Sequence, residues 1–203
     1  MILSIFLLVI LFLLLSRASA SAEEKPSVHL LATGGTIAGK ASSETATTGY
    51  EAGALGVEDL LSALPEVNDY ARVTGEGICG IDSKDMTDAI WLTLSERVNA
   101  LAGEKDGLVV IHGTDTMEET AYFLQLTVNP SIPLVLTGAM RPATAVSADG
   151  PMNLLNAVRL AAHPSAKGKG VLVMMNDTIF GARNVTKGNT LSLDTFRSPD
   201  GPL

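Results

Sequence analysis

Short apolar runs alternate along the chain with stretches in which apolar residues recur at three- and four-residue steps. The short runs, closed by Gly or Pro, predict buried strands, and the longer periodic stretches predict helices. The predicted strands are residues 28–33, a short strand within 73–81, 108–111, 134–136 and 171–175. The predicted helices are residues 57–64, 85–101, 117–126 and 151–162.

Strands that alternate with helices are typical of βαβ units. The sequence therefore predicts an α/β fold, Rossmann-like or flavodoxin-like, with a mostly parallel sheet and helices on both faces. Residues 39–53 are small and polar and contain three glycines, which predicts a mobile loop. In sheets of this kind, ligands bind in the crevice at the carboxyl ends of the strands.

Small and polar residues follow four of the predicted strands. They are Gly34-Gly35-Thr36, residues 112–116 (HGTDT), residues 137–141 (TGAMR) and Asn176-Asp177. A ligand site formed jointly by these strand ends would explain the pattern. Ordinary turn chemistry is the alternative, because Gly, Asn and Asp all favour turns.

The N-terminal segment differs in character from the remainder. Residues 2–15 are almost wholly apolar but shorter than the ~20 residues that span a membrane. Ala18-Ser19-Ala20 follows and fits a signal-peptidase site. We interpret residues 1–20 as a secretory signal, cut after Ala20 or Ala22, which predicts a periplasmic or secreted protein with no membrane attachment after cleavage. An uncleaved anchor is the alternative.

Charge and cysteine content exclude further classes. The 203 residues contain 14 Lys and Arg against 22 Asp and Glu, a net charge of −8, which argues against nucleic-acid binding. Cys79 is the single cysteine, so neither an intrachain disulfide nor a cysteine-rich zinc cluster can form. Three histidines leave little for a multi-histidine metal site.

Thr36 is a candidate nucleophile, because two glycines before it let the backbone turn sharply toward a ligand. A helix cap is the alternative. The same stretch nearly fits the phosphate loop G-x-x-x-x-G-K-[ST], but Ala41 stands where that loop needs a hydroxyl for Mg²⁺. The residues after Ala41 do not look helical, which further weakens a nucleotide-triphosphatase assignment.

Other polar residues allow two interpretations each. Thr114 offers a hydroxyl and Asp115 could bind a substrate ammonium, and Asp115 or Thr116 could cap the helix that follows. Lys187 would become a base beside Thr114 if burial lowered its pKa, whereas spacing alone favours a solvent-facing lysine. His112 is expected to be a packed structural residue. The pair Glu118 and Glu119 is expected to be solvated at a helix start.

Four segments resemble bacterial type II L-asparaginases. They are residues 30–39 (LLATGGTIAG), 107–124 (GLVVIHGTDTMEETAYFL), 137–158 and 171–190, and the similarity extends from about Val28 to Leu203. The resemblance implies a two-domain, homotetrameric amidohydrolase. Such an enzyme converts the small-molecule substrate L-asparagine, and often L-glutamine, to the acid and ammonia, without metal or cofactor.

The same resemblance implies roles for individual residues. Thr36 matches the nucleophile, and Tyr50 matches the tyrosine that assists it. Thr114, Asp115 and Lys187 match a second polar triad. The remaining matches are to substrate-binding positions: Ser83 and Asp115 for the α-carboxylate and α-ammonium, and the backbone around Ala139 for the substrate amide.

Two features depart from the family pattern. Lys84 stands where similar proteins have Gln or Glu, and a lysine could pair with the α-carboxylate but would repel the α-ammonium. The chain also stops at Leu203, so we interpret residues 21–203 as an N-terminal asparaginase domain that lacks the C-terminal domain and the acidic group it gives a neighbouring subunit. An amino-acid-binding protein without turnover is the alternative function.

Overall fold

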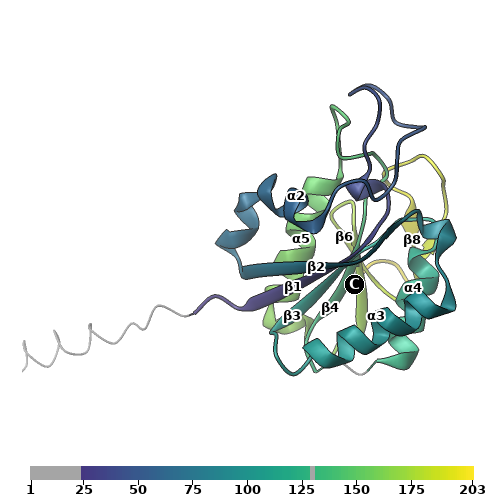
Figure 1. Ribbon diagram of the computed structural model, residues 1–203. Coiled ribbons are helices and arrows are strands. Elements are labelled where there is room, and N and C mark those ends of the chain that lie inside the picture. The colour runs from purple at the N-terminus through teal and green to yellow at the C-terminus, as the bar shows by residue number, and fades with distance from the viewer. Residues whose placement is uncertain (1–23, 129–130) are drawn as a thin grey trace, which may run out of the picture.

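A six-stranded sheet forms the centre of the computed structural model, which describes residues 24–128 and 131–203 (Figure 1). The strand order is β2-β1-β3-β4-β5-β6, and each neighbouring pair is parallel except β5 with β6. The strands are β1 (Ser27–Gly34), β2 (Arg72–Ile81), β3 (Gly107–Ile111), β4 (Leu134–Thr137), β5 (Val171–Met175) and β6 (Thr178–Gly181). The predicted mostly parallel α/β fold is confirmed.

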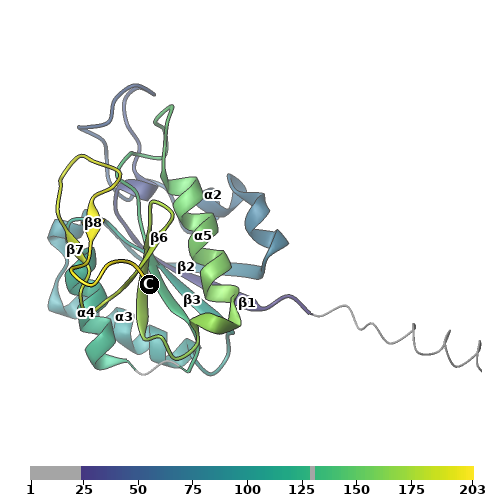
Figure 2. The same cartoon turned by 180° about the vertical axis from the view of Figure 1, so that it is seen from behind.

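Helices cover both faces of the sheet. One face carries α2 (Val57–Ser62) and α5 (Gly150–Ala162), and the other carries α3 (Asp88–Leu101) and α4 (Met117–Thr127) (Figures 1 and 2). Successive strand side chains point to opposite faces, so Leu30 packs in the α2–α5 core and Leu31 in the α3–α4 core. Each central strand is thus buried on both sides, which explains why these strands are continuous apolar runs.

The strand order reverses at β1. From β1 the chain crosses through α2 to β2 on one side, and from β2 it crosses through α3 to β3 on the other side of β1. The connections that leave the carboxyl ends of β1 and β3 therefore diverge to opposite faces, and a crevice opens between them. This switch point is where the fold can accept a ligand.

The structure corrects several details of the predicted elements. Strand β2 has ten residues where a short strand was predicted, and α3 begins at Asp88 because a short 3-10 helix (Ser83–Asp85) precedes it. Thr116 is the N-cap residue of α4, as one of the two alternatives had it, but its side chain makes no capping hydrogen bond because its hydroxyl donates to the Ser83 carbonyl at 2.8 Å. Three strands were not predicted: β6, β7 (Thr186–Lys187) and β8 (Phe196–Arg197).

The last of the four predicted polar clusters, which follows β5, is a turn. Asn176 and Asp177 connect β5 to the antiparallel β6, and both adopt left-handed backbone conformations with φ of 48° and 57°. Asn and Asp tolerate this conformation better than other non-glycine residues. Turn chemistry, rather than a ligand site, therefore explains these two residues.

The predicted signal segment, residues 1–20, lies outside the described residues. Among the helices that are described, none has the length and apolar character needed to cross a bilayer.

Candidate active site

Two glycine turns bring the ends of β1 and β3 into direct contact. Gly35 follows β1 with φ of 81°, and a Cβ atom built on it would lie 2.4 Å from the N and Cα atoms of Gly113, which follows β3. Only residues without side chains allow backbones to approach so closely. Thr36 and Thr114 are the next residues after these glycines, so the two hydroxyl-bearing turns are held against each other.

The Gly35→Ala substitution tests this contact. We expect it to lower the free energy of unfolding by about 2–4 kcal/mol, because the methyl group adds overlap with the Gly113 backbone to the strain of a positive φ. Gly49→Ala is the matched control, since Gly49 also has a positive φ (68°) but its Cβ would meet no atom within 4 Å. Urea denaturation should give a loss of only ~1 kcal/mol for the control. Equal losses for both variants would contradict the close contact.

Thr36 forms a hydroxyl pair with Tyr50. The Thr36 Oγ1 and Tyr50 Oη atoms are 2.6 Å apart, and either oxygen can be the donor. Thr36 is buried, with 8% of its surface exposed, in a short 3-10 helix (Thr36–Ala38). The prediction that Thr36 and Tyr50 share a site is consistent with this geometry.

The irregular loop 39–53 carries Tyr50 back to Thr36. Its two ends are joined by reciprocal backbone hydrogen bonds of 3.0 Å between Lys40 and Glu51. A second loop supports it from outside, because the Thr144 hydroxyl accepts from the Ala41 amide at 2.9 Å and the Ala143 amide donates to the Gly39 carbonyl at 3.0 Å. These contacts fix the register of the loop and thereby the place of Tyr50.

Thr114, Asp115 and Lys187 form a second cluster beside the first. The Lys187 ammonium donates to Thr114 Oγ1 at 2.9 Å and to Asp115 Oδ1 at 2.5 Å. The Lys187 side chain is 11% exposed, whereas that of Asp115 is 57% exposed. The solvent-facing alternative for Lys187 is therefore wrong. Because Thr114 is buried and Asp115 faces outward, the cluster has one buried hydroxyl and one accessible carboxylate.

Glu118 was expected to be a solvated acid, and this expectation is wrong. Its carboxylate accepts hydrogen bonds from the Thr186 hydroxyl, at 3.1 Å, and from the Lys187 amide. The residue thus links the first turn of α4 to β7. Its neighbour Glu119 is exposed, as expected.

Ser83 and Lys84 lie on the 3-10 helix after β2. Ser83 is buried, and its hydroxyl oxygen accepts from the Asp115 amide at 3.1 Å, which places it against the second cluster. Lys84 is exposed, and its ammonium lies 3.0 Å from Asp82 Oδ2. The hydrogen bond to Asp82 raises the pKa of Lys84.

Ala139 is fully buried in the turn after β4, so neither its side chain nor its backbone is exposed to solvent. The Asp149 carboxylate holds the following residues by accepting from the amides of Met140 and Arg141, both at 2.9 Å. The Asn153 side-chain amide donates to the Gly138 carbonyl at 3.0 Å. A carboxylate and an amide from the start of α5 thereby fix the course of this turn.

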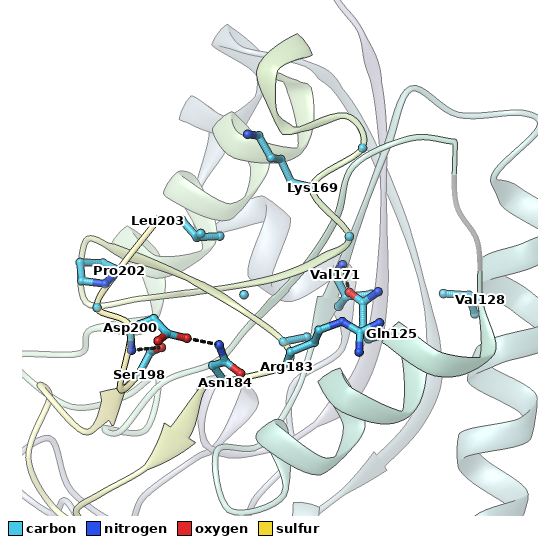
Figure 3. Close-up of a pocket in the computed structure, with 15 residues that line it drawn as sticks. Gln125, Val128, Lys169, Val171, Arg183, Asn184, Ser198, Asp200, Pro202 and Leu203 are labelled. Carbon is cyan, nitrogen blue, oxygen red and sulfur yellow. Dashed lines mark hydrogen bonds between the residues drawn. The ribbon is translucent and has the colours of Figure 1, made fainter.

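A cavity of about 530 Å³ adjoins the first cluster. Residues from the 39–53 loop, the β2 end, the β4 turn and the 190–191 segment form its wall: Thr47, Thr48, Gly49, Tyr50, Asp82, Met140, Arg141, Thr190 and Leu191. Tyr50 links this cavity to Thr36. A cavity of about 560 Å³ between the α4 end, β6 and residues 198–203 contains none of the predicted site residues (Figure 3).

His112 is a structural residue, as predicted. It is fully buried, and its Nδ1 lies 2.7 Å from the Gly113 carbonyl oxygen. Its Nε2 lies 2.9 Å from the Thr120 hydroxyl. The Thr120 oxygen accepts a hydrogen bond from Trp91 Nε1 at 2.8 Å. A carbonyl can only accept, so Nδ1 carries the proton and Nε2 accepts from Thr120. Burial lowers the pKa of His112 to about 4, so the ring is neutral at pH 7.

The lowered pKa of His112 predicts an acid-dependent loss of stability. The unfolded chain takes up a proton near pH 6.5, whereas the folded ring does so only near pH 4. The stabilisation is therefore complete above about pH 6.5 and falls by about 3 kcal/mol as the pH drops toward 4. Urea denaturation at about pH 7 and about pH 4 should show a smaller loss for His112→Asn than for the wild type. An identical loss would contradict the burial of a neutral ring.

The phosphate-loop alternative does not agree with the structure. Lys40 is exposed, and the fully described stretch from residue 40 to α2 contains no helix whose amino terminus could hold phosphate. Within residues 24–128 and 131–203, no group of three or more His, Cys, Asp or Glu is arranged to hold a metal ion.

The fold and the two clusters define the class of protein: a doubly wound α/β domain with two threonine hydroxyls, each bonded to its own partner, on adjoining turns at its switch point. Residues 27–203 match the family model described as "Asparaginase, N-terminal", and the chain belongs to this family. It is 55% identical over 188 residues to "L-asparaginase 2" of Bacillus subtilis, covering 90% of this chain and 50% of the relative. It is 52% identical to "Probable L-asparaginase periplasmic" of Haemophilus influenzae, covering 89% and 52%.

Among solved structures, "Probable Cytoplasmic L-asparaginase from Campylobacter jejuni" superposes with a TM-score of 0.87. The two sequences are 52% identical, and the match covers 88% of this chain and 55% of that one. The chain thus spans about half the length of the relatives it matches.

Proposed function

We propose that this chain takes part in hydrolysis of the side-chain amide of L-asparagine, and of L-glutamine in addition, to the acid and ammonia. In this proposal residues 21–203 form the N-terminal domain of such an enzyme. The observation that carries the proposal is the contact of Gly35 with Gly113, because it sets the Thr36–Tyr50 pair beside the Thr114–Lys187 pair. High identity to proteins named L-asparaginase supports it.

In the proposed first step, Thr36 Oγ1 attacks the amide carbon, its proton passes to the Tyr50 oxygen, 2.6 Å away, and the Tyr50 hydroxyl gives its own proton to the amide nitrogen. The C–O bond forms as the carbonyl π pair moves to oxygen, which yields a tetrahedral oxyanion. Backbone amides of the surrounding turns are suited to stabilise that charge. The oxyanion collapses, the C–N bond breaks, and the nitrogen, which has received the proton relayed through Tyr50, leaves as ammonia.

The second step returns the enzyme to its starting state. Water attacks the aspartyl ester on Thr36, the C–O bond to the threonine breaks, and the hydroxyl regains a proton. Thr114 and Lys187 form the other proton-bearing pair, with the hydroxyl and the ammonium 2.9 Å apart. We assign them to proton transfer during these steps.

Substrate recognition is assigned to the residues around the clusters. Asp115 has an accessible carboxylate for the α-ammonium, and the buried Ser83 hydroxyl beside it suits the α-carboxylate. Lys84 adds positive charge at this end, although its ammonium already contacts Asp82. The backbone around Ala139 is assigned to the amide group. Gripping both α-substituents would fix the side-chain amide in attack geometry.

Ammonia release from L-asparagine by the purified chain tests the proposal. We expect ammonia and L-aspartate in equal amounts, with L-glutamine tested in parallel. Calorimetry on the same sample separates turnover from binding. Asparagine binding without ammonia would contradict the proposal and favour an amino-acid-binding protein.

The proposal extends to where the protein is exported and how the full-length enzyme assembles. We propose that residues 1–20 direct secretion, so that the mature protein is periplasmic or secreted, and that the full-length enzyme is a homotetramer. A Haemophilus relative is named periplasmic, whereas the Campylobacter structure is named cytoplasmic. The apolar run followed by Ala-Ser-Ala favours export here.

A further inference from the structure

Glu118 ties the hairpin that carries Lys187 to the first turn of α4. Its Oε1 atom accepts from the Thr186 hydroxyl at 3.1 Å, and its Oε2 atom accepts from the Lys187 amide. Both carboxylate oxygens are thus used, and both partners lie on β7. Glu118 and Thr186 are 68 positions apart in the sequence, so the contact exists only in the folded chain.

Strand β7 receives little support from other strands. Among the described strands it pairs with β8 alone, and each of the two has two residues. Val185 and Phe196 are buried in the α3–α4 core and anchor the hairpin, but apolar contacts do not define the rotation or register of a backbone amide. The hydrogen bond from the Lys187 amide to Glu118 does.

Both ends of Lys187 are therefore fixed to one rigid unit. Its amide is bound by Glu118 in the first turn of α4, and its ammonium is bound by Thr114 and Asp115 just before that helix. A lysine side chain has a flexible four-carbon stem and loses much conformational entropy when its ammonium is held in one place. Fixing the backbone next to the target reduces the range of positions that the ammonium can sample.

We propose that Glu118 is a positioning residue for Lys187, holding its ammonium at hydrogen-bond distance from Thr114. The catalytic consequence rests on the proposed function, whereas the mechanical consequence does not. Glu118 need not touch the substrate, since it acts through the backbone of β7.

The chain supplies a matched control in Glu119. Both glutamates lie in the first turn of α4, where negative charge interacts favourably with the helix dipole. Glu119 is exposed, and no side-chain hydrogen bond joins it to another residue in the described part of the chain. Replacing either one removes the same charge from the same turn, but only Glu118 contacts the hairpin.

The first experiment compares steady-state kinetics of Glu118→Gln, Glu118→Ala and Glu119→Gln. We expect kcat to fall ~10–100-fold for Glu118→Ala with little change in KM, because a displaced catalytic group slows the chemical step more than binding. The fall should be smaller for Glu118→Gln, whose single carbonyl oxygen can keep one of the two bonds. Thr186→Val, which removes only the hydroxyl partner, should also show a partial loss. Equal kcat values for Glu118→Ala and Glu119→Gln would overturn the proposal.

The second experiment needs no turnover. Reductive methylation with peptide mapping measures how fast the Lys187 amine reacts, with the exposed Lys84 as an internal reference. We expect Lys187 to react several-fold faster in both Glu118 variants and at the wild-type rate in Glu119→Gln. Unchanged reactivity in a folded Glu118→Gln protein would overturn the positioning role. Faster reactivity in a chain that releases no ammonia would support positioning and contradict the proposed function.

Discussion

The Thr36→Ala substitution is expected to lower asparagine turnover by on the order of 10⁴-fold or more, the scale seen when a nucleophile that acts with its partners is removed. No other hydroxyl is paired with Tyr50, among the described residues, to take its place. Substrate affinity should change little, because the groups assigned to the α-substituents, Ser83 and Asp115, are untouched. Stopped assays of ammonia release and calorimetric titration with asparagine measure the two quantities separately.

Thr36→Ser provides the control for this substitution, since it keeps the hydroxyl and removes only a methyl group. We expect it to retain most of the activity. Trapping of the acyl intermediate, followed by peptide mapping, should find the adduct on the peptide that contains Thr36. An adduct on another peptide, or substantial turnover by Thr36→Ala, would refute the assignment of the nucleophile.

The Lys187→Met substitution is expected to lower kcat by ~10²–10⁴-fold, the usual contribution of a positioned proton-transfer group. Methionine has a similar length but cannot donate to Thr114 Oγ1 or pair with Asp115. The cost in stability should be small, about 1 kcal/mol, because the Asp115 side chain is 57% exposed and is solvated without its partner. Steady-state kinetics and thermal unfolding measured on the same preparation distinguish the two effects.

Lys167→Met is the matched control, because Lys167 is exposed and lies after α5, away from both clusters. It removes the same charge from the chain and should leave kcat within about twofold of the wild type. If Lys187→Met retained full kcat, Lys187 would have only a structural role. Equal losses in the two variants would indicate a general charge effect.

The core of the fold follows from periodicity. Strands such as residues 108–111 and 171–175 are apolar throughout because the sheet is covered on both faces, and the predicted helices agree with the observed ones to within a few residues. The two-residue strands β7 and β8 are too short to leave any periodic signal. Strand β6 depends on a left-handed turn at Asn176 and Asp177, which the sequence presents only as polar residues.

The candidate site residues also differ in whether a periodic segment places them. Thr36, Thr114 and Asp115 could be predicted because they follow apolar strands, where the fold collects its ligand groups. Tyr50 is assigned from the family resemblance alone, and spacing around Lys187 favours a solvent-facing lysine, since the loop and the hairpin that place these two residues have no repeating pattern. Glu118 was missed because an acidic residue in a first helical turn already has a sufficient local explanation, and its partners lie in a distant segment.

The contact between Gly35 and Gly113 has a consequence for how such a site can diverge. Because main chain meets main chain there, the spacing between the Thr36–Tyr50 pair and the Thr114–Lys187 pair is set by the sheet, and no side chain lies at the contact through which it could be adjusted. Under the proposed function, selection for a longer or shorter substrate would therefore act on the loop that carries Tyr50 and on the turn around Ala139. The reaction itself would stay constant while the loop and the turn change.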